Sequence, residues 1–258
     1  MSSPLTSPVD RRRTPAGYGG GDDAVWRPLY RLGGGAALVC AAMTVTGVVT
    51  FLVWPPPDGT VAEWFGLFQR NAFVGLLSLD LALLISFVAS TPLVLALYLA
   101  LRRAGEAAML VGAALALVSV AVYTASSRVF EMLALSEQYA VATTAAERAA
   151  LEAAGRAMLT VYLGAFAGPT PAPGGYQGTA FNVSFVLWCV AGALMSGVAH
   201  RSGRLGRGTG LVGLVGNVLA LGLFVPNVGV VLSLSSLPLL LSWFLLLARR
   251  LFRLGKEP

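Results

Sequence analysis

The run AMLTVYLGAFA, residues 157–167, decides the fold, because it is the most ambiguous of seven apolar runs in the chain. It has only 11 residues, whereas a helix that crosses a membrane needs about 20 predominantly apolar ones. The chain therefore has six or seven spans, depending on whether this run crosses. The other six runs are residues 33–54, 73–101, 107–126, 180–199, 209–225 and 229–248.

The composition is that of an integral membrane protein. Hydrophobic residues make up 56% of the chain and charged residues 12%, the mean hydropathy is +0.74, and a soluble domain has about 25% charged residues. The lipid bilayer is thus a predicted partner. Nucleic acid is not, because the basic residues stand at the ends of apolar runs, which is a topology signal. Heavy use of Ala, Gly and Arg indicates a bacterium, and hence its cytoplasmic (inner) membrane.

The distribution of basic residues favours six spans. With six spans both termini lie inside, and 14 of the 18 basic residues are on the inner side. Only Arg70, Arg128, Arg148 and Arg156 are then outside. If residues 157–167 also cross, everything from Arg201 onward moves out and the split becomes 7 inside and 11 outside. Cytoplasmic loops normally carry the excess of Lys and Arg.

The predicted fold is therefore an all-α membrane protein, a six-transmembrane-helix bundle. Residues 1–31, rich in Ser, Pro and Gly, are expected to be a disordered cytoplasmic tail. Residues 32–253 form the transmembrane domain, and residues 127–179, between the third and fourth spans, are extracytoplasmic.

An extracytoplasmic amphipathic helix is predicted between spans three and four, from about residue 145 to residue 162. Thr144 and Glu147 have the spacing of a capping box, and Glu152 stands four residues before Arg156, the favourable order for a helical ion pair. One apolar stripe would dock this helix on the outer ends of the spans. The stripe consists of Leu151, Met158, Tyr162 and Phe166.

A second polar connection follows the first span. Thr60 and Glu63 again have capping-box spacing. Trp64, Phe65 and Phe68 are predicted to lie in the membrane interface, where aromatic side chains are enriched.

Five segments resemble one known family. In chain order these are LSLDLALL, LALYLALRR, LALSEQYAVATTAAERAALEAAG, YQGTAFNVSF and LLARRLFRLG. They are similar to a bacterial family of uncharacterised multi-pass membrane proteins, a domain of unknown function, over residues 27–255. The chain departs from the family pattern at residues 163–175, which resemble an insertion. The resemblance implies no activity, cofactor or catalytic residue.

Asp80 is the ionisable residue that lies deepest in an apolar run, and such groups are functional candidates. Arg102 marks the inner surface, and 22 residues of helix place Asp80 about 33 Å away, at the outer edge of the hydrocarbon core. Asp80 is then either an interfacial carboxylate bonded to Arg70 or to nearby backbone, or part of an outward-facing ligand site. The other candidates for that site are Gln69, Asn71, Gln177, Asn182 and Asn227.

Enzyme signatures are weak. Ser196 and His200 stand four residues apart on one predicted helix, but His200 adjoins Arg201 at the inner surface and no third group orients its ring. Cys40 and Cys189 lie inside apolar runs without metal or redox spacing. We therefore predict no catalytic residue, no metal and no cofactor.

Small residues at four-residue spacing predict close helix contacts. The pairs are Gly192 with Ser196, Ala193 with Gly197, and Gly206 with Gly210. Asn217 is predicted to hydrogen-bond across helices.

Three functional classes remain open. A binding, sensory or accessory protein needs only an outer surface for a small molecule or a protein partner, which residues 127–179 and 55–72 can provide. A small-molecule transporter or permease subunit needs a polar path, yet only Asp80 and Asn217 interrupt the spans. A membrane enzyme needs clustered acid–base or metal-binding residues. The sequence favours the three classes in that order.

Overall fold

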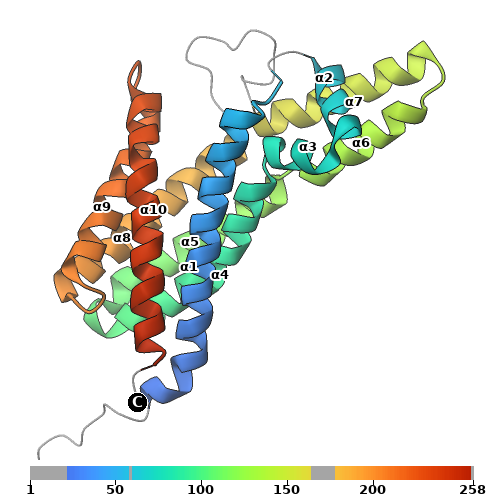
Figure 1. Ribbon diagram of the computed structural model, residues 1–258. Coiled ribbons are helices and arrows are strands. Elements are labelled where there is room, and N and C mark those ends of the chain that lie inside the picture. Colours follow the sequence, from blue (N-terminus) through green and yellow to red (C-terminus); the bar gives the residue numbers. More distant parts are fainter. Residues whose placement is uncertain (1–21, 58–59, 164–177, 257–258) are drawn as a thin grey trace, which may run out of the picture.

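The computed structural model describes residues 22–57, 60–163 and 178–256, and every regular element in these ranges is a helix (Figure 1). The predicted all-α class is therefore confirmed. The elements are α1 (Asp22–Val53), α2 (Val61–Arg70), α3 (Ala72–Leu79), α4 (Leu81–Leu101), η1 (Arg102–Ala104), α5 (Glu106–Ser126), α6 (Val129–Val141), α7 (Ala145–Leu163), α8 (Thr179–Ser202), α9 (Arg207–Leu221), η3 (Gly222–Phe224) and α10 (Gly229–Leu254).

Six segments are long and apolar enough to cross a membrane. They are α1, α4, α5 with α6, α8, α9 and α10. The predicted number of spans is therefore confirmed for the described residues, and the chain is an integral membrane protein. Residues 157–163 of the ambiguous run form the end of α7, which is not one of the six, and residues 164–167 lie outside the described ranges.

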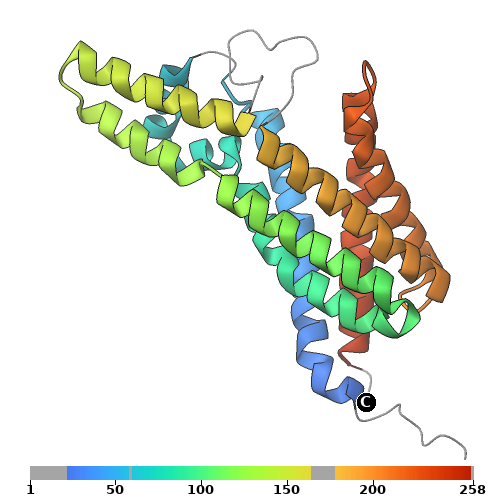
Figure 2. The ribbon, with the colours of Figure 1, turned by 180° about the vertical axis from the view of Figure 1, so that it is seen from behind.

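The six spanning helices pack into one bundle with a largely apolar core. Helix α1 lies against α4 and α10, α5 against α4 and α8, and α9 against α8 and α10. The turned view in Figure 2 shows α5 and α8 side by side in front of α1 and α10. Leu93, Met109, Met195, Trp243 and Leu247 are among the buried residues of this core.

Glycines allow the helices of the bundle to approach closely. A Cβ atom on Gly192 of α8 would collide with the side-chain amide of Asn217 of α9, and one on Gly210 would collide with the backbone of His200. The close contacts predicted at these glycines are thus present, whereas Gly197 faces open space. Asn217 does not bond across helices as predicted: its Nδ2 donates to the carbonyl of Gly213, 2.7 Å away in its own helix.

Helices α2, α3, α6 and α7 pack together at one end of the bundle, and we call this unit the cap. Trp64, Phe65 and Phe68 of α2 are buried in its core, with Phe65 fully inaccessible. The prediction that these aromatic residues lie in the lipid interface was wrong, because α6 and α7 cover them. The core also contains Val61, Leu79, Val129, Met132 and Leu159.

Two helix breaks separate the cap from the bundle. Asp80 interrupts the predicted 73–101 run, so that residues 72–79 form α3 and belong to the cap. Ser127 and Arg128 separate α5 from α6. The combined segment Glu106–Val141 has 36 residues, about 54 Å of helix against a hydrocarbon core of about 30 Å, so α6 extends beyond the bilayer when α5 spans it.

The first helix begins earlier than expected. Residues 22–31 were predicted to be part of the tail, but they form the first turns of α1. Tyr30 is buried, and Arg31 Nε donates to the carbonyl of Gly255, 3.0 Å away, so these turns pack against the end of α10. Residues 1–21 of the predicted tail lie outside the described ranges.

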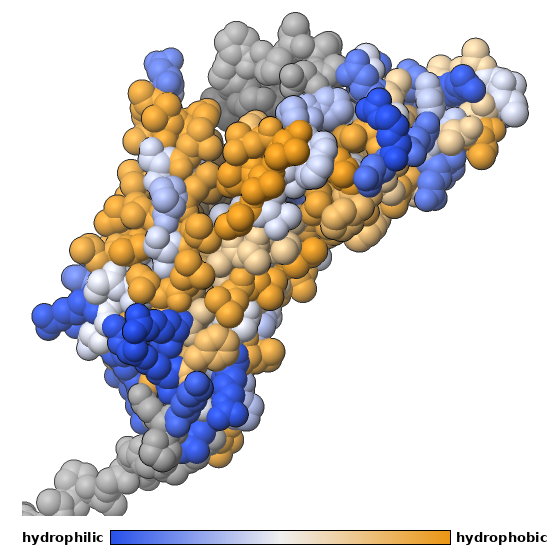
Figure 3. Space-filling model, in the orientation of Figure 1, coloured by the Kyte–Doolittle hydropathy of each residue, from blue (hydrophilic) through white to orange (hydrophobic). Residues whose placement is uncertain are grey.

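Basic residues gather at the end of the bundle opposite the cap, which we call the basic end. Figure 3 shows hydrophilic surface at this end and over the cap, with an apolar band between them. The guanidinium group of Arg250 lies against Gly206, which brings the α8–α9 connection next to α10. The basic side chains concerned are Arg27, Arg31, Arg102, Arg103, Arg201, Arg204, Arg207, Arg249, Arg250, Arg253 and Lys256.

Candidate functional site: a groove at Asp80

Asp80 lies at the junction of cap and bundle, between α3 and α4. Its amide donates to Leu76 O over 3.1 Å, and its carbonyl accepts from Leu84 N over 3.0 Å. Helical hydrogen bonds therefore continue on both sides of the break, and the direction of the chain changes at one residue. The residue is only 8% exposed.

Tyr123 of α5 holds the carboxylate of Asp80. Its phenol, itself fully buried, donates a hydrogen bond to Asp80 Oδ2. The Tyr123 ring stacks on Phe87 of α4 with centroids 4.1 Å apart, and Phe181 of α8 approaches it edge-on at 6.2 Å. The Asp80–Tyr123 pair thus joins three spanning helices at the level where the cap begins.

The pairing with Tyr123 corrects the sequence-based interpretation of Asp80. Arg70 was considered as a partner, but its side chain is exposed on α2. Tyr123 was not predicted as a site residue. The two residues are 43 positions apart, and only the packing of α4 on α5 brings them together, so no local sequence signal identifies the pair.

Asp80 also lines a groove of about 170 Å³ between the cap end of α1 and the α3–α4 junction. Its polar lining includes Thr50, Ser78 and Asp80, and Ser78 Oγ donates to the carbonyl of Trp54 over 3.3 Å. Aromatic and aliphatic walls complete the groove, which therefore has an amphipathic lining. These walls come from Phe51, Trp54, Pro56, Leu77, Leu79, Ala82 and Leu83, with Gly47 on α1.

Two of the other candidate residues form hydrogen bonds within the cap. Gln69 Nε2 donates to Ser136 O over 3.2 Å, and Asn71 Oδ1 caps α3 by accepting from Val74 N over 3.1 Å, so both have structural roles in the cap. Asn182, on α8, follows Phe181, which contacts Tyr123.

The last two residues predicted for the ligand site are Asn227 and Gln177. Asn227 is exposed in the α9–α10 turn with a φ of 67°, and Figures 1 and 2 both show this turn apart from the cap. Gln177 lies outside the described ranges.

The capping box predicted at the start of α7 is present. Thr144 Oγ1 accepts from Glu147 N over 3.2 Å, and Glu147 Oε2 accepts from the amides of Thr144 and Thr143 over 3.1 and 3.0 Å. These donated hydrogen bonds, above all that from the Thr144 backbone, lower the pKa of the Glu147 carboxyl.

The stripe was predicted to dock α7 on the outer ends of the spans, but its described residues pack on α2 in the cap core. Leu151 and Met158 are half-buried, and Gly155 and Leu159 are buried. The Tyr162 side chain and Phe166 lie outside the described part.

The Glu152–Arg156 ion pair predicted within α7 is replaced by a contact to α6. Glu152 Oε1 accepts from Tyr139 Oη over 2.8 Å. The guanidinium of Arg148 lies 5.8 Å from the centre of the Tyr139 ring. Both contacts join α7 to α6 and contribute to the stability of the cap.

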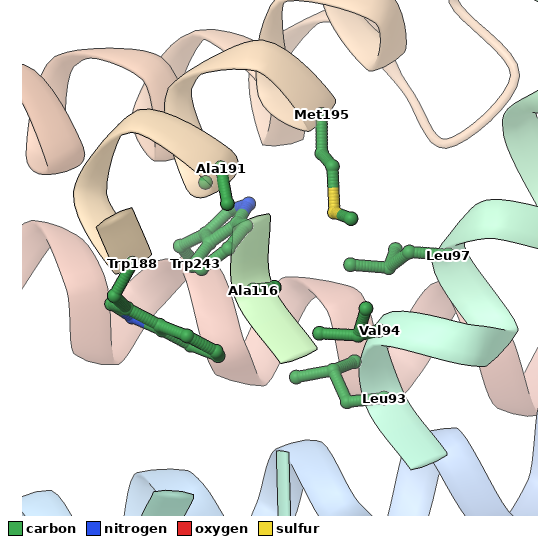
Figure 4. A pocket seen from close by; sticks show the side chains of 9 residues that line it. Leu93, Val94, Leu97, Ala116, Trp188, Ala191, Met195 and Trp243 are labelled. Atoms are coloured by element: carbon green, nitrogen blue, oxygen red, sulfur yellow. The ribbon is translucent and has the colours of Figure 1, made fainter. Parts of the chain in front are cut away.

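One cavity in the bundle interior has little room for a ligand. Figure 4 shows a cavity between α4, α5, α8 and α10, with Trp188 and Trp243 on one side and Met195 and Leu97 on the other. Its volume is about 10 Å³ and its lining is apolar except for the indole nitrogens. That space holds at most about one water molecule.

Ser196 and His200 form no catalytic pair. His200 Nδ1 is 2.9 Å from the carbonyl of Arg207, while Ser196 Oγ is buried without a hydrogen-bond partner among the described residues. Nor do three His, Cys, Asp or Glu side chains converge anywhere in the part of the chain that the structure describes.

The chain was compared with known protein families, with curated proteins and with solved structures, and none of the three comparisons finds a match.

Proposed function

We propose that this protein is a binding, sensory or accessory protein of a bacterial cytoplasmic membrane, whose groove at Asp80 receives a small-molecule ligand. Both termini are cytoplasmic and the cap is extracytoplasmic, because the basic end carries most of the Arg and Lys residues. The groove then opens outward. We also propose that the chain belongs to the bacterial family of multi-pass proteins that its motifs resemble.

The observation that carries this proposal is the groove of about 170 Å³ with a carboxylate in its lining. Ligand sites are concave and mostly apolar, with a few polar groups that fix the ligand. Thr50, Ser78 and Asp80 provide such groups. The groove also lies where cap and bundle meet, and junctions between units are a common place for ligand sites.

The transporter alternative has less support. Two buried serines of the bundle donate to backbone carbonyls of the bundle itself: Ser90 Oγ to Phe87 O and Ser119 Oγ to Ser184 O, each over 2.6 Å. Together with the small apolar cavity, these bonds favour a static bundle core over a polar conduction path.

Native mass spectrometry of the full-length protein, extracted from its own membrane, tests the proposal. The wild type should retain a small-molecule adduct. Gly47→Leu should lose it, because Gly47 lines the groove and a side chain there meets open space. Gly35→Leu is the matched control, since Gly35 lies on the same helix, also faces open space and does not line the groove. Equal adduct levels in all three proteins, or none in the wild type, would contradict the proposal.

A further inference from the structure

We infer that the basic end binds the headgroup of an anionic phospholipid from the membrane leaflet that it contacts, at a site on the α8–α9 connection beside α10. This site is separate from the groove at Asp80, and the inference does not depend on the proposed function. It combines the placement of two guanidinium groups, the shortage of protein acceptors for them and the apolar surface next to them.

Arg250 of α10 lies against a glycine of the α8–α9 connection. Gly206 has a φ of 88°, in the left-handed region that glycine adopts readily. A Cβ atom on Gly206 would lie 2.8 Å from Arg250 Nη2 and 3.1 Å from its Cζ, so the absence of a side chain lets the guanidinium group come this close to the backbone. Arg250 is half-buried as a result.

Arg207 of α9 lies along the other end of the same connection. A Cβ atom on Gly203 would meet Arg207 Cγ at 3.8 Å and Nε at 3.9 Å. Arg207 is exposed, and its carbonyl is 2.9 Å from His200 Nδ1, which joins the start of α9 to the end of α8. Because Gly203 and Gly206 belong to one short connection, side chains from two different helices place positive charge on the same part of the surface.

The protein supplies few acceptors to these two groups. A guanidinium has five N–H donors, yet the side chains of Arg207 and Arg250 form no ion pair or hydrogen bond within the part of the chain that the structure describes. Glu106 is the one acidic side chain described at the basic end. A half-buried guanidinium without a partner is costly. A phosphate group supplies both negative charge and oxygen atoms that Arg binds in a bidentate geometry.

Apolar surface next to the two arginines favours a phospholipid over a soluble anion. Leu211 follows Arg207 by four positions on α9, Leu245 precedes Arg250 by five positions on α10, and both leucines are 48% exposed. Both helices are among the six spans, and Figure 3 shows the hydrophilic surface of the basic end next to the apolar band. Basic pockets between spanning helices bind anionic lipid headgroups. The acyl chains would lie on the leucines.

Native mass spectrometry of the delipidated full-length protein in a neutral detergent tests the inference. Dioctanoyl phosphatidylglycerol is the anionic probe, and dioctanoyl phosphatidylcholine has the same acyl chains with a zwitterionic headgroup. Glycerol phosphate is an anionic headgroup without acyl chains. Wild type should bind phosphatidylglycerol at least about tenfold more tightly than either other probe, because each arginine at the headgroup level contributes about fivefold in affinity.

Two double variants with equal loss of charge locate the binding. The double variant Arg207→Gln, Arg250→Gln should bind phosphatidylglycerol no more tightly than phosphatidylcholine. The double variant Arg70→Gln, Arg156→Gln is the matched control, since it removes two exposed arginines of the cap and should bind every probe as wild type does. If the first double variant does not fold, the exposed Arg207 decides alone, and Arg207→Gln should weaken phosphatidylglycerol binding about fivefold.

Three results overturn the inference. Equal affinity of wild type for phosphatidylglycerol and phosphatidylcholine, or phosphatidylglycerol binding that the substitutions at the site leave unchanged, would show that no such site exists. An equal loss of binding in the cap control would show that net charge alone attracts the lipid. If glycerol phosphate binds as tightly as phosphatidylglycerol, the site takes a soluble phosphate, and the lipid inference fails.

Discussion

At the scale of single residues, Glu147 links the stability of α7 to pH. Three hydrogen bonds from Thr143 and Thr144 reach its carboxylate and lower its pKa in the folded protein. A depressed carboxyl pKa contributes stability that is fully present above the unfolded value of about 4.3 and is lost as the pH falls through the lower folded value.

We expect Glu147→Gln to lower the thermal midpoint of the cap relative to wild type at pH 7. The difference should shrink as the pH falls below about 4.3. Circular dichroism melts from pH 7 to pH 3 measure both proteins. A difference that stays constant over this range would show that the charge of Glu147 does not stabilise the cap.

Substitution of two glycines of the cap by alanine should have opposite effects on stability. A Cβ on Gly155 of α7 would lie 2.6 Å from Val61 Cγ1 and 2.8 Å from Phe65 Cζ, whereas one on Gly66 of α2 meets open space. Alanine in a helix interior gains about 1 kcal/mol over glycine, but overpacking costs about 1–3 kcal/mol.

We therefore expect Gly155→Ala to destabilise the cap by up to about 2 kcal/mol. Gly66→Ala should stabilise it by up to about 1 kcal/mol. Urea unfolding followed by tryptophan fluorescence measures both changes, since Trp64 lies in the cap core. Stabilisation by both substitutions would mean that α7 does not sit this close to α2.

At the scale of elements, the cap and the bundle have separate hydrophobic cores, and α2 supplies much of the cap core. Phe65→Ala removes a fully buried ring, a change that costs about 3–5 kcal/mol. Phe73, on α3, is 63% exposed and serves as the control.

Hydrogen exchange should localise the effect of Phe65→Ala. Amides of α2, α6 and α7 should exchange faster, those of α8, α9 and α10 should keep wild-type rates, and Phe73→Ala should change neither set. Faster exchange throughout the chain would show that cap and bundle unfold as one unit.

At the scale of the whole molecule, the proposed orientation predicts which ends of the helices reagents reach. Thr143 lies in the cap and Ser202 at the basic end, and both are exposed. Native Cys40 and Cys189 are buried and give little background. A membrane-impermeant maleimide should label Thr143→Cys in intact cells and Ser202→Cys only after lysis. The reverse labelling pattern would show that the protein has the opposite orientation in the membrane.

The sequence predicts the helices of this fold better than their packing. Apolar length identifies the six spans, and the local spacing of Thr144 and Glu147 identifies the start of α7. The burial of Trp64 and Phe65 depends on α6 and α7, more than 60 positions later in the chain. For the same reason Asp80 is found as a lone carboxylate in an apolar run, while its partner Tyr123 is not.

The two-part construction of the cap also imposes an order on its biogenesis. Helices α2 and α3 leave the ribosome before α4, α5 and α6 exist, so the aromatic face of α2 is made well before the side chains that bury it. Until the third span has inserted, Trp64, Phe65 and Phe68 can be buried only at the membrane surface, since amphipathic helices with aromatic residues bind there. If translation stalls in this interval, the apolar face of α2 stays without its partners, and exposed hydrophobic surface of this kind promotes aggregation.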